Sequence, residues 1–283
     1  MNRKTLLKRM VHNPFFMSGI IIMVILLLIL WIVPNLIPYD ATTNSLLEMN
    51  KAPEWFSRGF EGHVLGTDSL GRDILARVLI GGRTSMKIGL IVVFIEIVIG
   101  TTMGLLAGYF GGIVDTVIMR LCDIILAIPN LILGIAIMAV LGPSIINLII
   151  VLCFTGWVQF CKLTRNNVII AKEMEYSKAS KAIGASDTHI MFTQILPNVT
   201  TDIIIIASEK FGQAILLESA LSFLNLGIAA PAPSWGNMIS DGKSFLMVYP
   251  WIAMSAGFAL MFCVLASNFI GDGLRDVLDP KRY

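Results

Sequence analysis

The sequence predicts an all-α membrane protein with six transmembrane helices and with both termini in the cytoplasm. Of the 283 residues, 56% are hydrophobic and only 14% are charged, and the mean hydropathy is +0.80. A soluble domain is about 45–50% apolar and about 25% charged. Too few charges are present to cover a water-soluble surface, and six apolar segments are long enough to cross a bilayer.

A helix needs about 20 predominantly apolar residues to cross about 30 Å of hydrocarbon, and these six segments are near or above that length. They are residues 15–37, 88–110, 113–141, 144–161, 200–226 and 249–270. The runs are continuous and lack the period-two alternation of barrel strands, so helices are expected. The first run follows a basic start, as in a signal peptide, but it is too long for one and no A-x-A site follows. We therefore expect a retained helix.

Basic residues in the short loops predict the orientation. Arg3, Lys4, Lys8 and Arg9 place the N-terminus in the cytoplasm, and six crossings return the C-terminus there. The predicted parts are a cytoplasmic tail (1–14), the first helix (15–37), an extracytoplasmic loop (38–87), a five-helix core (88–271) with a cytoplasmic loop (165–198), and a cytoplasmic tail (272–283). The outer loop mixes basic with acidic residues, but at about 50 residues it is near the length at which loop charge stops controlling orientation.

The cytoplasmic loop is much longer than the 2–8 residues that usually connect two helices. Its sequence predicts two short helices. The first covers about 172–183 and ends at Gly184, a residue favoured after a helix C-terminus. The second is capped by Ser186 or Asp187 and stops before Pro197. We expect Ile190, Phe192 and Ile195 to form a small apolar patch on it, and such patches mark partner sites. A solvated linker is the alternative.

Motifs for chemistry are missing from the sequence. No GxxxxGK[ST] loop is present to bind ATP phosphates, and neither a Ser/His/Asp nor a Cys/His arrangement stands out. The four cysteines and three histidines form no metal-binding spacing, and the net charge of +2 does not indicate a nucleic-acid partner. We therefore expect a protein that is not an enzyme, that binds no cofactor or metal, and whose energy comes from another chain.

The cytoplasmic loop resembles the signature of ABC-type importer permeases, which is Glu-Ala-Ala, three residues, Gly, nine residues, and Ile-x-Leu-Pro. Ala179, Gly184 and the pair Leu196-Pro197 match, whereas Lys178, Ser180 and Gln194 replace the usual glutamate, alanine and isoleucine. In that family the loop forms a coupling helix that docks in a groove of the ATPase subunit. The resemblance implies this role for Glu175, Tyr176, Lys178, Ala179, Ser180, Gly184, Ala185, Ser186, Asp187, Thr188, Ile190, Phe192, Leu196 and Pro197.

Other blocks are similar to dipeptide, oligopeptide and nickel importers, and to the second of their two permease subunits, which has a long first outer loop. These blocks are GTDSLGRDILARVLIGGRTSM (66–86), GYFGG (108–112), MRLCDIILAIPNL (119–131), ALSFLNLGIAAPAPSWGNMI (220–239) and NFIGDGLRDVLDP (268–280). The resemblance implies a type I ABC importer permease fold in the cell membrane of a prokaryote. It implies four partners besides the lipid bilayer: a second permease subunit, two ABC ATPase subunits that use ATP, and an extracytoplasmic substrate-binding protein. Peptides are the expected cargo, and nickel or a metal chelate is the alternative.

Charged residues at membrane depth are functional candidates, because burying them in lipid is costly. Glu96, Glu209, Lys210 and Glu218 are candidates for the translocation pathway or for the contact with the second permease. Arg120 and Asp123 are three residues apart, and we expect them to form a structural pair. Because of these charges, an ion-coupled secondary carrier is an alternative function. A membrane scaffold without a transport role is a third possible function. The long docking loop argues against both.

Aromatic residues in the outer loop have two interpretations. Trp55, Phe56 and Phe60 either form a platform for the binding protein or rest on lipid headgroups, where Trp is favoured. The segment PAPSWGNMI (231–239) precedes the last apolar run, and its prolines and Trp235 predict a rigid cap near the mouth of the pathway.

Overall fold

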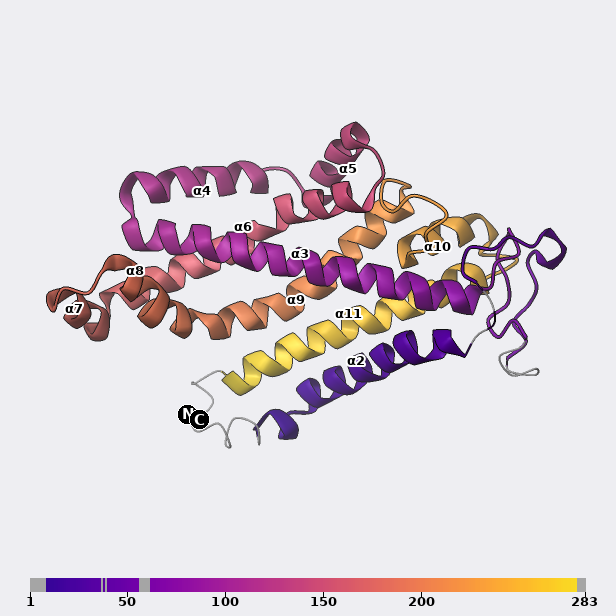
Figure 1. The fold of residues 1–283 in the computed structure, drawn as a ribbon, viewed down its shortest axis with the longest axis horizontal. Helices are drawn as coiled ribbons and strands as arrows, with labels where there is room; N and C mark the ends of the chain where they lie inside the picture. Colours follow the sequence, from indigo (N-terminus) through magenta and orange to yellow (C-terminus); the bar gives the residue numbers. More distant parts are fainter. Residues whose placement is uncertain (1–8, 37, 39, 56–61, 279–283) are drawn as a thin grey trace.

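The structure, a computed structural model, describes residues 9–36, 38, 40–55 and 62–278. This part of the chain is an elongated bundle of helices without a named β-strand (Figure 1). The α-helices are α2 (Pro14–Ile32), α3 (Ile74–Phe110), α4 (Gly112–Leu126), α5 (Asn130–Leu141), α6 (Ile145–Glu173), α7 (Glu175–Ala182), α8 (Asp187–His189), α9 (Leu196–Phe223), α10 (Trp235–Gly242) and α11 (Trp251–Leu278). Short 3₁₀ turns cover Val33–Asn35, Leu46–Glu48 and Lys243–Phe245, and a π-helical turn covers Ile190–Ile195.

Five helical segments of the described chain are long and apolar enough to cross a membrane. They are Pro14–Asn35, Ile74–Phe110, Ile145–Glu173, Asp187–Phe223 and Trp251–Leu278. A sixth crossing results only if α4 and α5 together count as one span, and these two helices are bent by 85° relative to each other. The fold is therefore that of a multi-pass helical membrane protein.

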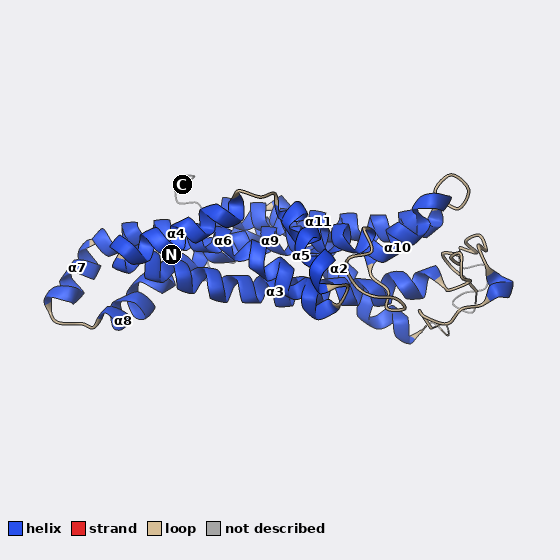
Figure 2. Ribbon diagram, turned by 90° about the horizontal axis from the view of Figure 1, so that it is seen from above, coloured by secondary structure: helices blue, strands red, loops and turns tan. Residues whose placement is uncertain are grey.

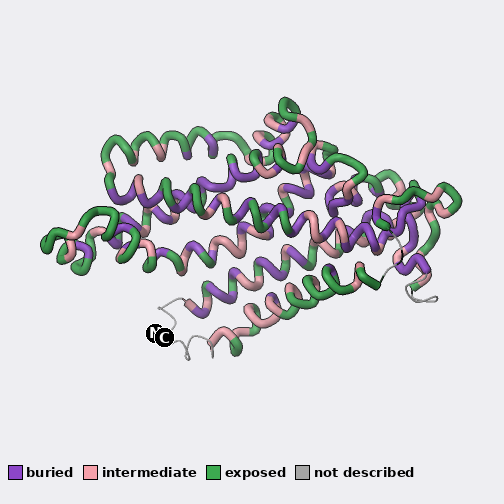
Figure 3. Tube along the Cα trace, viewed as in Figure 1, coloured by how far each residue is buried: buried purple, intermediate pink, exposed green. Residues whose placement is uncertain are grey.

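A stripe of glycines on α3 explains its close packing against α6. Added Cβ atoms at Gly100, Gly104 and Gly108 would approach the carbonyl oxygens of Trp157, Cys161 and Arg165 to 2.4, 2.5 and 2.8 Å, respectively. Small residues at a spacing of four let two helix backbones approach within a membrane. The helix pair α3–α6 forms the buried centre of the bundle, and α2 lies at its edge with an exposed face (Figure 3).

The bundle has two distinct ends (Figures 1 and 2). The α7 end contains α7, α8, the start of α2 and the last turns of α11. The α10 end contains α10 and the connections that precede α3. The polar loop, the start of α2 and the last described turns of α11 therefore lie toward the same end of the bundle.

The predicted single helix over 113–141 is interrupted at residues 127–129. Pro129 disfavours helical geometry in the preceding residue and has no N–H for a helical hydrogen bond. Accordingly, α4 ends at Leu126 and α5 begins at Asn130. The sharp bend was not predicted from the sequence.

Helix α3 begins fourteen residues before the predicted start at residue 88. Asp73 caps it by accepting a hydrogen bond from the Ala76 N–H at 2.7 Å. The first turns hold Arg77, which is buried among acidic partners instead of being exposed in a loop. The last 14 residues of the predicted outer loop are therefore helical.

Candidate functional site

The polar loop forms a compact unit at the α7 end. α7 ends before Gly184, whose φ of +88° is a backbone geometry that glycine adopts without strain. Ser186 then caps α8, and its hydroxyl accepts a hydrogen bond from the His189 N–H at 3.3 Å. The first predicted helix and its end at Gly184 thus agree with the structure, although α6 extends to Glu173 before α7 begins.

Hydrogen bonds join the two arms of this loop. The Gln194 side-chain amide donates to the Ser180 hydroxyl at 2.6 Å, and the Ala185 N–H donates to the Ser180 carbonyl at 3.1 Å. The Asn198 side chain donates to the Tyr176 hydroxyl at 3.1 Å. Two residues that depart from the permease signature, Ser180 and Gln194, therefore contact each other and stiffen the loop.

The loop is also attached to the end of α3. The Tyr109 hydroxyl donates to Asp187 Oδ1 at 2.6 Å, and Lys172 Nζ donates to the Tyr109 carbonyl at 2.6 Å. Lys181 lies 3.7 Å from Asp187, and the ammonium groups of Lys172 and Lys181 lie 5.3 and 6.0 Å from the centre of the Tyr109 ring. A displacement of the loop must therefore act on α3 as well as on α9.

The predicted apolar patch is only partly correct. Ile190 and Ile195 are buried against the bundle, whereas Phe192 is 56% exposed. Ile183, before Gly184, is 85% exposed and was not part of the predicted patch. The apolar groups that the loop presents outward are therefore Ile183 and Phe192.

The second predicted helix does not stop at Pro197. The π-helical turn Ile190–Ile195 follows α8 directly, and the chain continues into α9 with Pro197 in the first turn. Proline is tolerated there because the first-turn N–H groups of a helix need no partner within the helix. The loop thus joins α9 without a flexible break.

Most of the other predicted coupling residues are exposed. The exposed ones are Glu175, Tyr176, Lys178, Ala179, Gly184, Ser186, Asp187, Thr188 and Pro197, and the half-buried ones are Ser180, Ala185 and Leu196.

Two predicted membrane charges face a common cavity. Glu96 of α3 and Lys210 of α9 line a cavity of about 40 Å³ together with Asn130, Thr155 and Gln213. Both charged residues are buried, and an added Cβ at Gly156 would lie 1.7 Å from Glu96 Oε1. Gly156 therefore leaves the space that the glutamate occupies. Glu96 and Lys210 were predicted as separate candidates, and their shared cavity was not predicted.

The other two charges of α9 have partners within the chain. Glu218 is fully buried and accepts hydrogen bonds from the hydroxyls of Ser222 at 2.8 Å and Ser219 at 3.3 Å. Glu209 binds Arg275 of α11 at 2.6 Å. In this structure Glu218 does not reach the surface of the subunit, and Glu209 links two helices.

The predicted pairing of Arg120 with Asp123 is not observed. Asp123 instead contacts Lys162 of α6, with 3.0 Å between Nζ and Oδ1. Arg120 and Asp123 are both exposed, and α4 lies along α6, so Lys162 reaches the Asp123 carboxylate from the neighbouring helix. On the same pair of helices Arg165 binds Asp115. Sequence spacing alone did not reveal these contacts between helices.

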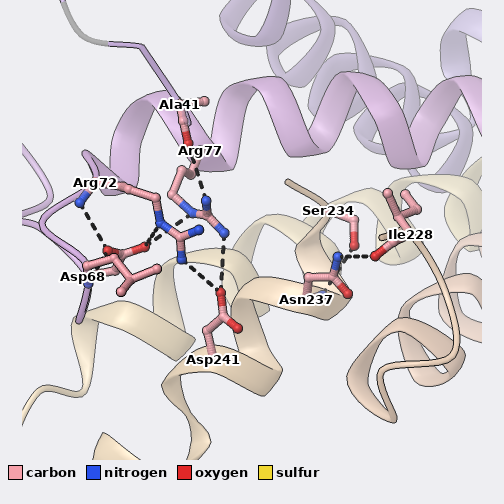
Figure 4. Close-up of polar contacts among 9 residues, drawn as sticks. Ala41, Asp68, Arg72, Arg77, Ile228, Ser234, Asn237 and Asp241 are labelled. Carbon is pink, nitrogen blue, oxygen red and sulfur yellow. Dashed lines mark hydrogen bonds and ion pairs between the residues drawn. The ribbon is translucent and has the colours of Figure 1, made fainter. Parts of the chain in front are cut away.

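An ion-pair network at the α10 end was not predicted (Figure 4). Arg72 binds Asp68 at 2.7 Å and Asp241 of α10 at 3.1 Å. Arg77 lies 3.4 Å from Asp68 and 3.3 Å from Asp241, and it donates to the Ala41 carbonyl at 3.2 Å. The mixed charges of loop 38–87 were the only sequence signal, because Asp241 lies far away in the chain.

This network borders a cavity of about 430 Å³ at the α10 end. The segment 228–232 lines its other side, and Asn237 holds that segment by donating to the Ile228 carbonyl at 2.8 Å (Figure 4). Trp235 is completely buried, and its indole N–H donates to the Val78 carbonyl at 3.0 Å. The segment that the sequence analysis predicted to be rigid is thus firmly attached to α3.

A second polar cluster holds the start of α3. His63 Nδ1 lies 2.9 Å from Asp73 Oδ2, and His63 Nε2 lies 3.3 Å from Glu48 Oε2. Burial raises the pKa of Asp73, although its contacts with the Ala76 N–H and His63 act in the opposite direction. A hydrogen bond from Lys51 lowers the pKa of Glu48.

Of the three predicted platform residues, Trp55 is exposed beside a cavity that Trp251 also lines. Phe56 and Phe60 lie outside the described residues.

Comparison with known proteins gives consistent matches. Residues 100–282 match the family described as "Binding-protein-dependent transport system inner membrane component". The dipeptide transport system permease protein of Alkalihalophilus pseudofirmus is 42% identical over 97% of this chain and 88% of its own. The glutathione transport system permease protein of Pectobacterium atrosepticum is 37% identical over 93% and 86%, and the oligopeptide transport system permease protein of Bacillus subtilis is 37% identical over 98% and 89%.

A solved structure shows a related fold. The MetNI methionine ABC transporter in an inward-facing conformation contains a chain that superposes with a TM-score of 0.56. The match covers 70% of this chain and 95% of that chain at 17% identity, so it concerns the fold alone. Together, the family match and the extended sequence identity confirm the resemblance that the motifs indicated. The chain belongs to the family of binding-protein-dependent transport system inner membrane components, which are permease subunits of ABC transporters in prokaryotic membranes.

Proposed function

We propose that this chain is the permease subunit of an ATP-driven importer of peptides and that residues 175–197 couple it to an ATPase. In this proposal it pairs with a second permease subunit, binds two ATPase subunits at the α7 end, and receives cargo from a binding protein at the α10 end. The relatives are permeases for dipeptides, oligopeptides and glutathione, which favours a peptide over nickel as cargo.

The observation that carries the coupling role is the way the loop is built. It projects from the bundle, presents Ile183 and Phe192 to the outside, and is bound to α3 through the bond between Tyr109 and Asp187. A free linker would need neither an internal set of hydrogen bonds nor exposed apolar groups. A docked ATPase could bury these groups and move α3 and α9 together as one body.

Thiol cross-linking tests this proposal. The four native cysteines are all buried, so a cysteine at exposed Ser186 is the accessible thiol. In the assembled importer, S186C should form a cross-link with the ATPase subunit. L47C is the matched control, because Leu47 is 97% exposed but belongs to the α10 end. Cross-linking of L47C to the ATPase, or no cross-linking of S186C, would contradict the proposed docking and orientation.

A backbone variant tests whether the loop transmits work. Gly184 has a φ of +88°, whereas proline fixes φ at about −65°, so Gly184→Pro must rearrange the turn. Assembly with the ATPase should weaken and ATP-dependent peptide uptake into proteoliposomes should fall. Gly257→Ala is the control, because no atom lies within 4 Å of a Cβ added there. If Gly184→Pro takes up peptide at the wild-type rate, this turn does not couple ATP hydrolysis to transport.

A further inference from the structure

The cavity between Glu96 and Lys210 is a built polar site at membrane depth. Glu96 is 3% exposed and Lys210 is 6% exposed, so both charged side chains are more than nine-tenths buried. Within the described chain Glu96 Oε2 has no hydrogen-bond partner, and Lys210 Nζ takes part in no hydrogen bond or ion pair. Opposite charges normally meet directly when they are buried, because separation leaves each one poorly compensated. Here the two residues form no ion pair, and both line a space of about 40 Å³.

The start of α5 faces the same space. Asn130, the first residue of α5, lines the cavity. Pro129 precedes it, no side chain caps the helix, and its first turn holds no acidic residue. The first N–H groups of a helix lack partners within the helix, and the helix dipole makes that end partially positive. The bend between α4 and α5 therefore brings an uncapped helix N-terminus to the cavity that contains the unpaired Lys210.

The opening of the cavity has polar side chains, although it lies among membrane helices. Gln213 is exposed, Asn130 and the apolar Leu217 are half-buried, and Glu96, Thr155 and Lys210 are buried. A polar amide facing lipid would be unfavourable. The α5–α9 face with this opening is consequently suited to an aqueous pathway beside a second permease subunit.

We infer that this cavity binds the terminal carboxylate of the transported peptide. Lys210 and the N–H groups at the start of α5 would bind the carboxylate, as uncapped helix ends within membranes do for anionic groups. Glu96 would accept the backbone N–H of the same terminal residue. This inference rests on the proposed peptide cargo.

The presence of Glu96 distinguishes this ligand from a simple anion. Chloride offers Lys210 a counter-charge, but it has no hydrogen-bond donor for the Glu96 carboxylate. A peptide terminus presents acceptors and a donor within one residue, and so satisfies both sides of the cavity. The volume admits that terminal group and not a whole peptide, so the remainder of the cargo would lie in the pathway outside. Without cargo, the volume suffices for about three water molecules that bridge the two charges.

The test compares a peptide with its C-terminal amide. Proteoliposomes contain the complete importer, and each peptide is supplied at a concentration that saturates the binding protein. Wild type should take up the free acid about tenfold faster than the amide, because one charge-assisted contact changes binding affinity by at least about tenfold. Lys210→Gln should reduce this ratio to about one, whereas Lys210→Arg should retain a preference for the free acid. Leu216→Ala, an exposed residue of α9 outside the cavity, is the control and should behave as wild type.

A double variant separates binding from a merely structural ion pair. Glu96→Gln combined with Lys210→Gln keeps two groups that can hydrogen-bond to each other or to water, so the importer should assemble. Its free-acid preference should still be absent. If the double variant regains the wild-type preference, the two charges only hold α3 and α9 together and the inference is wrong. Failure of wild type to take up any peptide with ATP would instead refute the proposed function.

Discussion

Replacing Tyr109 by phenylalanine tests whether the loop and α3 act as one body. The substitution removes the hydroxyl that donates to Asp187 at 2.6 Å and keeps the ring beside Lys172 and Lys181. A hydrogen bond to a charged group contributes about 1.5–3 kcal/mol. Because the Asp187 side chain is about half exposed, water replaces part of this contribution. A loss of about 1 kcal/mol is expected, which corresponds to a roughly fivefold larger population of the detached loop.

Hydrogen exchange and transport measure the two consequences. In Tyr109→Phe the amides of residues 186–190 should exchange about fivefold faster, provided that opening is local. More ATP should also be hydrolysed for each peptide taken up by proteoliposomes. Tyr249→Phe is the matched control, because no described residue contacts its hydroxyl by a hydrogen bond and it lies at the α10 end. Faster exchange with unchanged transport efficiency would refute the link between loop attachment and coupling.

Three further substitutions test other parts of the structure. Gly104→Val should destabilise the α3–α6 pair by about 1–3 kcal/mol, since an added Cβ approaches the Cys161 carbonyl oxygen to 2.5 Å; thermal unfolding in detergent should show a lower midpoint, and an unchanged midpoint would contradict the glycine packing. Arg77→Met should cost about 2 kcal/mol, because Asp68 loses one of its two arginine partners and the Ala41 carbonyl loses its donor. Proteolysis at the α10 end should increase, whereas exposed Lys51→Met should have little effect. Ser180→Ala should cost about 1 kcal/mol by removing the acceptor of Gln194; amides of α7 should lose protection, and equal protection would show that this bond does not stiffen the loop.

The sequence predicted the parts of the fold that depend on local chemistry. Hydrophobic length identified the long apolar helices, and glycine preference identified the end of α7 at Gly184. The loop between α6 and α9 was identified from its length, and the spacing of Gly184 and Leu196-Pro197 indicated the permease family. In these cases the decisive interaction is between the chain and its solvent, or within a few residues.

Features that depend on distant partners were not predictable in the same way. Asp123 pairs with Lys162 and not with Arg120, because α4 lies along α6. Arg77 is buried because Asp241 of α10 binds it. Pro197 was expected to end a helix. It instead follows the π-helical turn and lies in the first turn of α9, where its missing N–H has no cost. The predicted patch failed for Ile190 and Ile195 because the bundle, and not water, covers one face of that turn.

The same two helices connect the loop to the cavity. Tyr109 and Glu96 are thirteen residues apart on α3, which corresponds to about 20 Å along its axis. Lys210 lies at a similar distance, about 20 Å, from the start of α9, which joins the loop without a break. Both helices are therefore held together at the α7 end by the bond from Tyr109 to Asp187 and face each other again at the cavity. A movement of the loop that shifts α9 along α3 must change the distance between Lys210 and Glu96, and would thereby change how tightly a carboxylate between them is bound.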